Sequence, residues 1–202
     1  MSITPSVTRL LRSAGVSLTL AVSVIATGTA AAQAEVLVTP DASGDVVGVL
    51  IYSDGTRTPY PETEDGDIVR TRVAHRDDRV RIRIEYRDLL RKGHRDDFVR
   101  IRTDEGLKRD IIVESGPRNP RGRATMYRGL WSFKCKVDHR KSFRDSVLVI
   151  DVPRSCLGNP SWVRFRAVTA STCCSGEQTL YDAALTSNED EERDLSPRVY
   201  HD

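Results

Sequence analysis

The stretch DIVRTRVAHRDDRVRIRIEY, residues 67–86, decides the fold class of this chain. Its second half alternates charged side chains with four apolar ones, at Val80, Ile82, Ile84 and Tyr86. Residues 69–73 alternate in the same way, and the polar residues between the two runs have the length of a hairpin turn. Side chains along a β-strand point alternately to opposite faces, so this alternation predicts two half-buried strands.

The same pattern continues toward both ends of the chain. Further strands, each bounded by turn-forming residues, are expected at 46–52, 98–103, 107–114, 127–137, 147–152 and 162–169. Residues 147–150 are apolar at both parities, which is typical of a central strand covered on both faces. No segment shows a convincing helical period. Many short, closely spaced strands favour an all-β fold, an antiparallel β-sandwich or barrel.

The first 34 residues have the layout of a secretory signal peptide. Arg9 and Arg12 precede an apolar run at 16–25, and Ala32-Gln33-Ala34 forms an A-x-A cleavage site. The apolar run is too short to span a bilayer, and no later run reaches the roughly 18 apolar residues that a transmembrane helix requires. We therefore expect a secreted, extracellular protein that has no transmembrane segment after cleavage.

Removal of residues 1–34 leaves enough chain for one hydrophobic core. We expect a single β-sandwich domain over residues 35–175. From Gly176 the composition changes, and Glu189-Asp190-Glu191-Glu192 is a block of like charge with few apolar neighbours. Residues 176–202 are therefore expected to form an acidic, flexible C-terminal loop or tail, packed in part on the domain.

Four cysteines follow the expected cleavage site: Cys135, Cys156, Cys173 and Cys174. In an oxidising compartment, an even number of cysteines favours disulfides over metal binding. We favour a Cys135–Cys156 bond, since both residues lie at the ends of extended segments. The adjacent Cys173 and Cys174 would then form a strained ring with each other or bond to another chain. Crossed pairing between the two sets stays open as the main alternative.

Positive charge is concentrated in the middle of the chain, where residues 67–166 contain 26 Lys or Arg and 14 Asp or Glu. Many of these arginines fall at the exposed parity of predicted strands, where rows of guanidinium groups would attract sulfated, carboxylated or phosphorylated polymers. In the alternative interpretation they cover the sheet with their alkyl stems and pair with nearby acids. The candidate ligand-binding residues are Arg70, Arg72, Arg81, Arg83, Arg100, Arg102, Arg164 and Arg166, with Trp162 as a stacking platform for sugar rings.

The acidic N-terminal region offers oxygen ligands for a cation. Asp41 and Asp45 lie on either side of a serine at alternate positions, and Asp65 and Asp67 belong to a second acidic group. Calcium prefers such oxygen ligands, so these four aspartates are candidate ligands of a structural Ca²⁺. Turn capping by aspartate is the competing interpretation. The spacing is not that of an EF-hand, because Val46 stands where the EF-hand loop requires glycine. No other cofactor is expected.

The sequence contains no catalytic motif. It lacks G-x-S-x-G, H-E-x-x-H, a P-loop and a dinucleotide fingerprint. The four histidines, His75, His94, His139 and His201, lie in polar segments and are expected at the surface. We therefore expect a protein without enzymatic activity, and a hydrolase is the least favoured class.

Two stretches carry a resemblance to known proteins. One is Asp-Ile-x-x-x-x-Val-x-His at 67–75 with the Arg-Val-x-Ile-x-Ile strand that follows, and the other is VPRSCLGNPSWVR at 152–164. They resemble small secreted actinobacterial β-sandwich proteins of unassigned function, over about residues 41–200. The strand order is more distantly similar to family-nine carbohydrate-binding modules and DOMON-type domains. That similarity implies a jelly-roll-like sandwich that often holds calcium and binds sugars or haem, with no binding residue carried over to this chain.

Together these features predict a secreted, non-catalytic binding module for a polysaccharide or another polyanion of the cell surface. The alternative is an extracellular protein-protein interaction or structural protein, in which a sheet face docks onto another protein. Nucleic acid is not expected as a partner.

Overall fold

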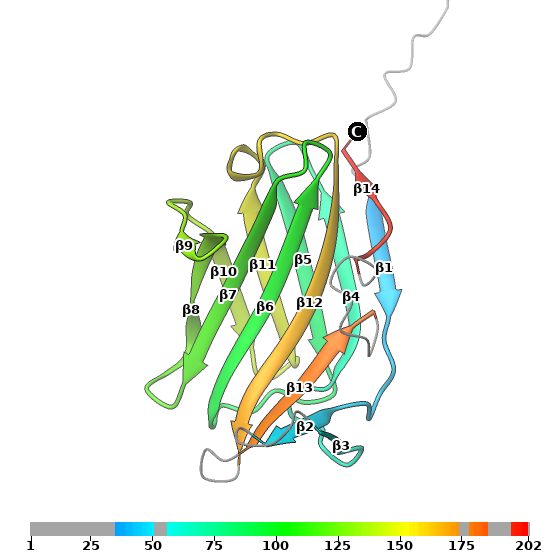
Figure 1. The fold of residues 1–202 in the computed structure, drawn as a ribbon, viewed down its shortest axis with the longest axis vertical. Coiled ribbons are helices and arrows are strands. Elements are labelled where there is room, and N and C mark those ends of the chain that lie inside the picture. Colours follow the sequence, from blue (N-terminus) through cyan, green and yellow to red (C-terminus); the bar gives the residue numbers. More distant parts are fainter. Residues whose placement is uncertain (1–34, 51–55, 174–177, 186–194, 202) are drawn as a thin grey trace, which may run out of the picture. The chain divides into compact units, whose positions relative to one another are not determined.

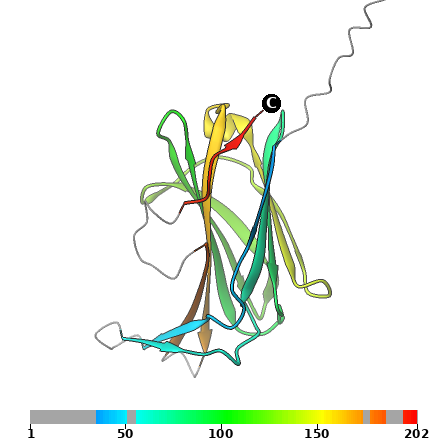
Figure 2. The same ribbon diagram turned by 90° about the vertical axis from the view of Figure 1, so that its right-hand side faces the viewer.

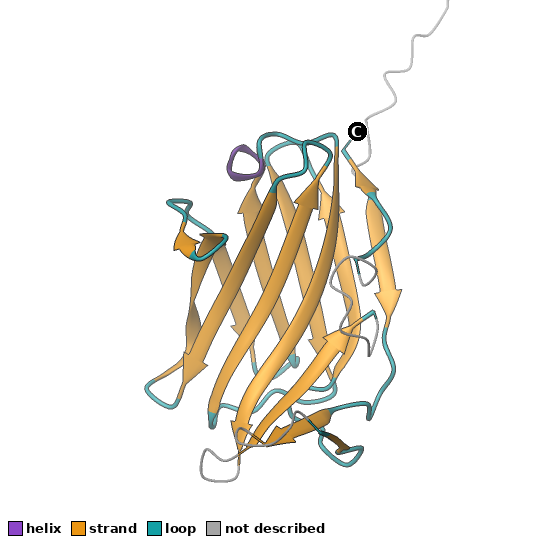
Figure 3. Cartoon of the chain, viewed as in Figure 1, coloured by secondary structure: helices purple, strands orange, loops and turns teal. Residues whose placement is uncertain are grey.

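The computed structural model describes residues 35–50, 56–173, 178–185 and 195–201. Strands make up nearly all the regular structure of this part, which contains one short 3₁₀ helix, η1 (Arg154–Leu157) (Figure 3). The expected signal peptide lies outside the described residues, and so do Cys174 and the side chain of Cys173. Within the described ranges, no helix has the length and apolar character needed to cross a membrane.

Two antiparallel sheets form the fold (Figure 1). The first has five strands in the order β1 (Val36–Pro40), β4 (Ile68–His75), β5 (Arg79–Tyr86), β11 (Val147–Pro153) and β10 (Asp138–Ser142). The second, called here the nine-stranded sheet, has the order β3 (Arg57–Pro59), β2 (Val47–Leu50), β13 (Gln178–Ala184), β12 (Trp162–Cys173), β6 (His94–Thr103), β7 (Lys108–Gly116), β8 (Asn119–Arg128) and β9 (Trp131–Ser132), with β14 (Val199–Tyr200) paired to β12. The prediction of an all-β fold with antiparallel sheets is confirmed.

One hydrophobic core lies between the two sheets, which Figure 2 shows from the side. Every second residue of β5 and of β6 is buried, as the alternation in the sequence predicts. Ile82 and Ile84 of β5 belong to the same buried cluster as Ile101 of β6 and Phe165 of β12. Burial of each such side chain is worth about 2 to 3 kcal/mol, so this cluster is what holds the sheets together. The arrangement is compatible with a jelly-roll.

The predicted disulfide between Cys135 and Cys156 is present, with the two Cα atoms 6.0 Å apart. It connects the segment before β10 to η1, and both cysteines pack against the core while remaining partly exposed. The predicted pairing of Cys173 with Cys174 lies outside what the structure describes.

Part of the segment expected as a C-terminal tail is a strand. β13 pairs with β12 along its whole length, and β14 brings residues 199–200 back to the start of β12. The sequence shows no apolar alternation in β13 because two of its inward-facing side chains, Gln178 and Asp182, are polar. Gln178 Nε2 donates a hydrogen bond to Tyr60 Oη (2.7 Å), which explains how one of them is accommodated. The acidic block at 189–192 lies outside the described residues.

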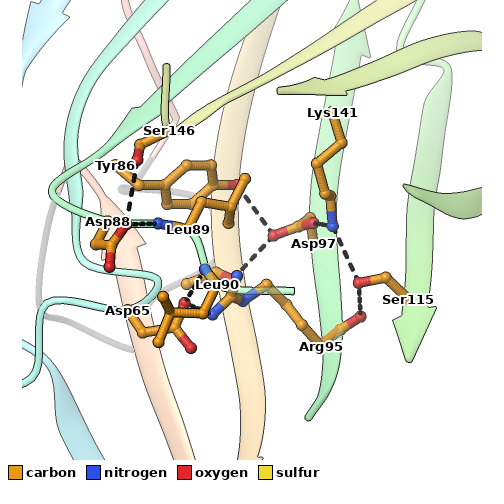
Figure 4. Close-up of polar contacts among 11 residues, drawn as sticks. Asp65, Tyr86, Asp88, Leu89, Leu90, Arg95, Asp97, Ser115, Lys141 and Ser146 are labelled. Carbon is orange, nitrogen blue, oxygen red and sulfur yellow. Dashed lines mark hydrogen bonds and ion pairs between the residues drawn. The ribbon is translucent and has the colours of Figure 1, made fainter. Parts of the chain in front are cut away.

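A buried polar network connects the sheets close to the core (Figure 4). The Lys141 ammonium of β10 donates to Asp97 Oδ2 of β6 (2.8 Å), and the hydroxyl groups of Tyr86 and Thr169 donate to Asp97 Oδ1 (3.0 and 2.9 Å). Both oxygens of this fully buried carboxylate therefore have partners. Complete burial, together with the nearby Asp97 charge, raises the pKa of Tyr86 well above its ordinary value.

Candidate functional site

Four aspartates from distant parts of the chain converge beside the start of β4. They are Asp41, Asp45, Asp67 and Asp182, called here the aspartate cluster. Asp41 follows β1, Asp45 precedes β2, Asp67 precedes β4, and Asp182 lies within β13. Carboxylate oxygens of Asp45, Asp67 and Asp182 all lie within 4.8 Å of one another. This spacing is short enough for a single cation to contact all three.

The loop of residues 41–45 is shaped around Asp67. The backbone N–H of Asp41 donates to the carbonyl of Val69 (3.0 Å), which aligns the start of the loop with β4. The backbone N–H of Gly44 (2.8 Å) and the Ser43 hydroxyl (3.4 Å) both donate to Asp67 Oδ2. Gly44 has a φ of +81°, a left-handed conformation that glycine adopts without strain. The Asp-x-Ser-Gly-Asp sequence therefore folds into a cradle for the Asp67 carboxylate.

Several carboxylate oxygens of the cluster are buried without a partner. Asp67 is 0% exposed, and while its Oδ2 also accepts from Arg87 (3.1 Å), its Oδ1 has no hydrogen-bond partner. Asp41 Oδ2 and Asp45 Oδ1 are likewise buried and have no hydrogen-bond partner. Buried polar atoms are nearly always paired in native proteins, because an unpaired one loses its hydration without compensation. The cluster therefore has unused capacity to bind a donor or a cation.

The surroundings of the aspartate cluster raise the pKa values of its carboxyl groups. Burial, reinforced by the neighbouring carboxylates, raises the pKa of Asp182 to about 8 and that of Asp41 to about 6. Burial and the Asp67 charge also raise the pKa of Asp45. Arg87 is the guanidinium in contact with Asp67, and it is shared with Glu64 (2.7 Å). Among the described residues, one shared positive charge therefore faces four carboxyl groups.

Three of the four predicted calcium ligands, Asp41, Asp45 and Asp67, meet in the cluster, whereas Asp65 does not. Asp65 Oδ1 accepts from the backbone N–H of Leu90 (2.9 Å) and pairs with the buried guanidinium of Arg95 (Figure 4). The sequence could not show this, because the ion pair depends on how the loop before β4 lies against β6. The fourth place is taken by Asp182, whose only sequence signal is a polar residue in an extended stretch.

The predicted arginine rows exist, but the structure places them on opposite faces of the sandwich. The residues on the outer face of the five-stranded sheet are Arg70, Arg72, Arg81 and Arg83. Those on the outer face of the nine-stranded sheet are Arg100, Arg102, Arg164 and Arg166. Parity in the sequence indicated correctly that they point outward. It could not indicate which of the two sheets each strand joins, so the nine candidates do not form one binding surface.

Several of these arginines are paired with acids. Arg81 makes a two-pronged contact with Asp151 (2.7 and 2.9 Å), and Arg83 contacts Glu85 (2.8 Å). On the nine-stranded sheet, Arg100 lies 2.7 Å from Asp110. For these positions the structure agrees with the alternative interpretation, in which arginine covers the sheet and pairs with acids.

Trp162 and Arg164 contact the C-terminal segment. The guanidinium of Arg198 lies 4.5 Å from the centre of the Trp162 ring. Arg164 donates to the carbonyls of Leu195 and Ser196 (2.9 and 2.7 Å). Both side chains therefore contact residues 195–200, and the Arg198 guanidinium covers one face of the Trp162 ring.

The outer face of the five-stranded sheet has a shallow basic depression, called here the arginine hollow. It is lined by Arg72, Ala74, Arg76, Arg81, Arg83, Arg140 and Val149. The strand register aligns Arg72 with Arg83, Arg83 with Val149, and Val149 with Arg140. Arg72, Arg76 and Arg140 form no ion pair with any described residue, so the hollow carries uncompensated positive charge.

The outer face of the nine-stranded sheet has a larger groove, called here the outer groove, with a volume of about 540 Å³. Its floor consists of two adjacent rows that cross the strands. The apolar row runs from Val168 through Phe98 to Ile112. The polar row runs from Arg166 through Arg100 and Asp110 to Tyr127. This groove could not be predicted from the sequence, because it arises only when β12, β6, β7 and β8 are neighbours.

The turn between β8 and β9 forms the rim of the outer groove. Leu130 lines the groove and is 95% exposed, and the next residue, Trp131, is 81% exposed. Large apolar side chains displayed together at this level of exposure are typical of interaction sites.

His75 is buried instead of lying at the surface as expected. Its ring Nδ1 is 3.1 Å from the carbonyl of Val199, and its ring centre is 5.3 Å from that of His201. Burial lowers its pKa, so the neutral ring is favoured. His75 therefore helps to hold β14 against β4, and it belongs to none of the three candidate sites.

Comparisons of the chain with protein-family models, curated proteins and solved structures find no match. The similarity to family-nine carbohydrate-binding modules and DOMON-type domains stays a prediction from the sequence. The aspartate cluster, the arginine hollow and the outer groove are the features of the described chain that support a function.

Proposed function

We propose that the protein is a secreted, non-catalytic module that binds a polysaccharide in the outer groove. The observation that carries this proposal is the side-by-side placement of the apolar row and the polar row on the groove floor. Both rows cross adjacent strands, so the floor is continuous from β12 to β7.

The two rows match the two kinds of surface on a sugar ring. Pyranose rings present C–H groups on their faces, which pack on apolar and aromatic side chains, and hydroxyl groups at their edges, which need fixed donors and acceptors. Phe98 and Ile112 offer an apolar surface for the C–H groups. The Arg100–Asp110 pair offers donors and acceptors for the hydroxyl groups, and its two contacts of 2.7 and 3.3 Å already fix its geometry. Neighbouring rows lie two residues apart along each strand, about 7 Å, so one ligand can contact both.

The size and openness of the groove favour a polymer over a small buried ligand. A volume of about 540 Å³ is within the range of ligand sites, roughly 300 to 1,000 Å³. The groove lies on the outer face of the sheet, and its rim carries Tyr127 and the exposed Leu130. A chain of sugars can lie across the strands while its ends extend into solvent.

A second candidate function, polyanion binding, is favoured by the arginine hollow. Arg72, Arg83 and Arg140 stand in one row without an acidic residue between them. Guanidinium groups bind sulfate and carboxylate groups through paired hydrogen bonds, so this face suits a sulfated or uronic-acid polymer. It lies on the opposite side of the sandwich from the outer groove, so each function can be removed without touching the other.

The test of the principal proposal is a glycan array followed by affinity electrophoresis in gels containing the polysaccharide that is retained. Replacing Tyr127 or Phe98 with alanine should reduce retention about tenfold, since each removes a stacking or packing surface. Tyr181→Ala is the matched control, because Tyr181 is an exposed tyrosine on β13 outside the groove. Thermal melts should show that all three variants fold.

Two results would contradict the proposal. One is the absence of retention on any glycan of the array. The other is equal retention of wild type, Tyr127→Ala and Phe98→Ala. Capture of another extracellular protein that survives competition by glycans would instead support the interaction-protein alternative.

A further inference from the structure

We propose that the aspartate cluster binds a calcium ion, which fastens the loop of residues 41–45 to the start of β4 and to β13. This site is separate from the outer groove, and its ligands include Asp182, to which the sequence analysis gave no role. It stands or falls independently of polysaccharide binding.

The first support is the orphaned oxygen of Asp67. This side chain is fully buried, and its Oδ2 already accepts from Gly44, Ser43 and Arg87. Its Oδ1 has no partner, although the carboxylate lies within 4.8 Å of the Asp45 and Asp182 carboxylates. A buried carboxylate oxygen beside other carboxylates can be satisfied by a proton on one of those neighbours or by a cation, and a cation is the partner that can contact all three residues at once.

The second support is the balance of charge. The loop, the start of β4 and β13 bring four carboxyl groups together. Within the described part of the chain, the guanidinium in contact with them is that of Arg87, which is also bonded to Glu64 and to the Pro61 carbonyl. Like charges at such separations repel strongly where water is excluded. A divalent cation attracts each of these carboxylates, so it offsets their mutual repulsion and links the chain segments that carry them.

The ligand type and spacing point to calcium. Every candidate ligand is an oxygen, whereas zinc prefers histidine and cysteine. Calcium lies about 2.3 to 2.6 Å from its ligands, so oxygens on opposite sides of one ion are about 4.6 to 5.2 Å apart. The oxygens of Asp45, Asp67 and Asp182 fall within 4.8 Å of one another, which this range accommodates. Magnesium needs shorter distances and a regular octahedron, which three carboxylates held by separate chain segments do not readily supply.

The experiment is isothermal titration calorimetry of the EDTA-treated, dialysed protein with CaCl₂ and separately with MgCl₂, together with thermal melts. We expect one calcium per chain, weaker magnesium binding, and a rise in Tm on adding calcium. Asp182→Asn keeps an oxygen that accepts from the backbone N–H of Ile68 but removes a charge, so calcium affinity should fall at least tenfold. Asp45→Asn, at the rim of the cluster, should do the same with less risk to folding. Asp138→Asn on β10 is the control, because its side chain is 72% exposed and outside the cluster.

The metal-free melts distinguish a lost ion site from a damaged fold. Without calcium, Asp182→Asn should melt at or above the wild-type temperature, because asparagine is neutral at every pH and its amide N–H can donate to a neighbouring carboxylate. With calcium the order should reverse. The proposal is overturned if millimolar calcium produces neither heat nor a change in Tm, or if both variants bind calcium as tightly as wild type.

Discussion

The ammonium nitrogen of Lys141 lies 2.8 Å from Asp97 Oδ2, and the two side chains are 1% and 0% exposed. This ion pair joins β10 of the five-stranded sheet to β6 of the nine-stranded sheet. Taking both charges out of water is costly, and the pair is tolerated because Tyr86, Thr169 and Ser115 satisfy its remaining hydrogen-bonding groups.

Removing one partner of this pair should be strongly destabilising. Lys141→Met keeps a similar volume but leaves the Asp97 carboxylate buried without its counter-charge, so we expect a loss of about 3 to 5 kcal/mol in the free energy of unfolding. Urea denaturation monitored by circular dichroism measures this loss. The double variant Lys141→Met with Asp97→Asn should recover part of it. A single variant as stable as wild type would show that the pair is not buried as the structure has it.

The stability of the metal-free protein should fall as pH rises from 4 to 8. Asp182 has its pKa raised from 3.8 to about 8 and Asp41 from 3.8 to about 6, so the folded state binds more protons than the unfolded state within this window. Their contribution is fully present below pH 4 and is lost as pH rises through the folded pKa values. Melts in EDTA at one-unit intervals test this. Asp182→Asn should flatten the upper half of the profile.

The Cys135–Cys156 disulfide should contribute about 3 kcal/mol, since it closes a loop over a sequence separation of 21 residues. The variant with both cysteines replaced by alanine should fold and unfold at a correspondingly lower urea concentration. Comparison of this variant with wild type under oxidising and reducing conditions measures the effect. If reduction lowers the stability of the variant as much as that of wild type, the important bond involves other cysteines.

Polyanion binding should depend on the arginine hollow. Replacing Arg72 and Arg140 together with alanine should shift elution from heparin to lower salt, because both lie in the hollow without an ion pair to a described residue. Arg123→Ala on β8 is the control, since Arg123 is exposed on the other sheet. Wild-type elution below physiological ionic strength would dismiss the polyanion function and leave the outer groove unaffected.

The fold class could be predicted because alternation is a local property. The alternation at 79–86 and 98–103 requires strands with one buried face and one solvent-facing face, and β5 and β6 have this form. The disulfide was predicted because both cysteines lie close to extended segments; the structure places Cys135 shortly before β10 and Cys156 shortly after β11, and these two strands are paired. The strand β13 was not predicted, because the polar residues Gln178 and Asp182 face inward and the alternation on which strand prediction depends is missing there.

The sites were harder to predict, because they depend on which strands become neighbours. Asp41, Asp45 and Asp67 were identified from oxygen-rich spacing, but Asp182 reaches the cluster only through the pairing of β13 with β12. Asp65 also carries a carboxylate that could bind calcium, but it pairs with Arg95 instead. The outer groove needs the register of four strands, which no single stretch of sequence contains.

The most direct test of the proposed function is residue-specific NMR of the backbone amides during titration with a soluble polysaccharide that the protein retains. The account predicts that the largest shift changes fall on Phe98, Ile112, Tyr127 and Val168, with small changes at Arg72 and Arg140. Shift changes confined to the five-stranded sheet, or no changes at saturating polysaccharide, would contradict it.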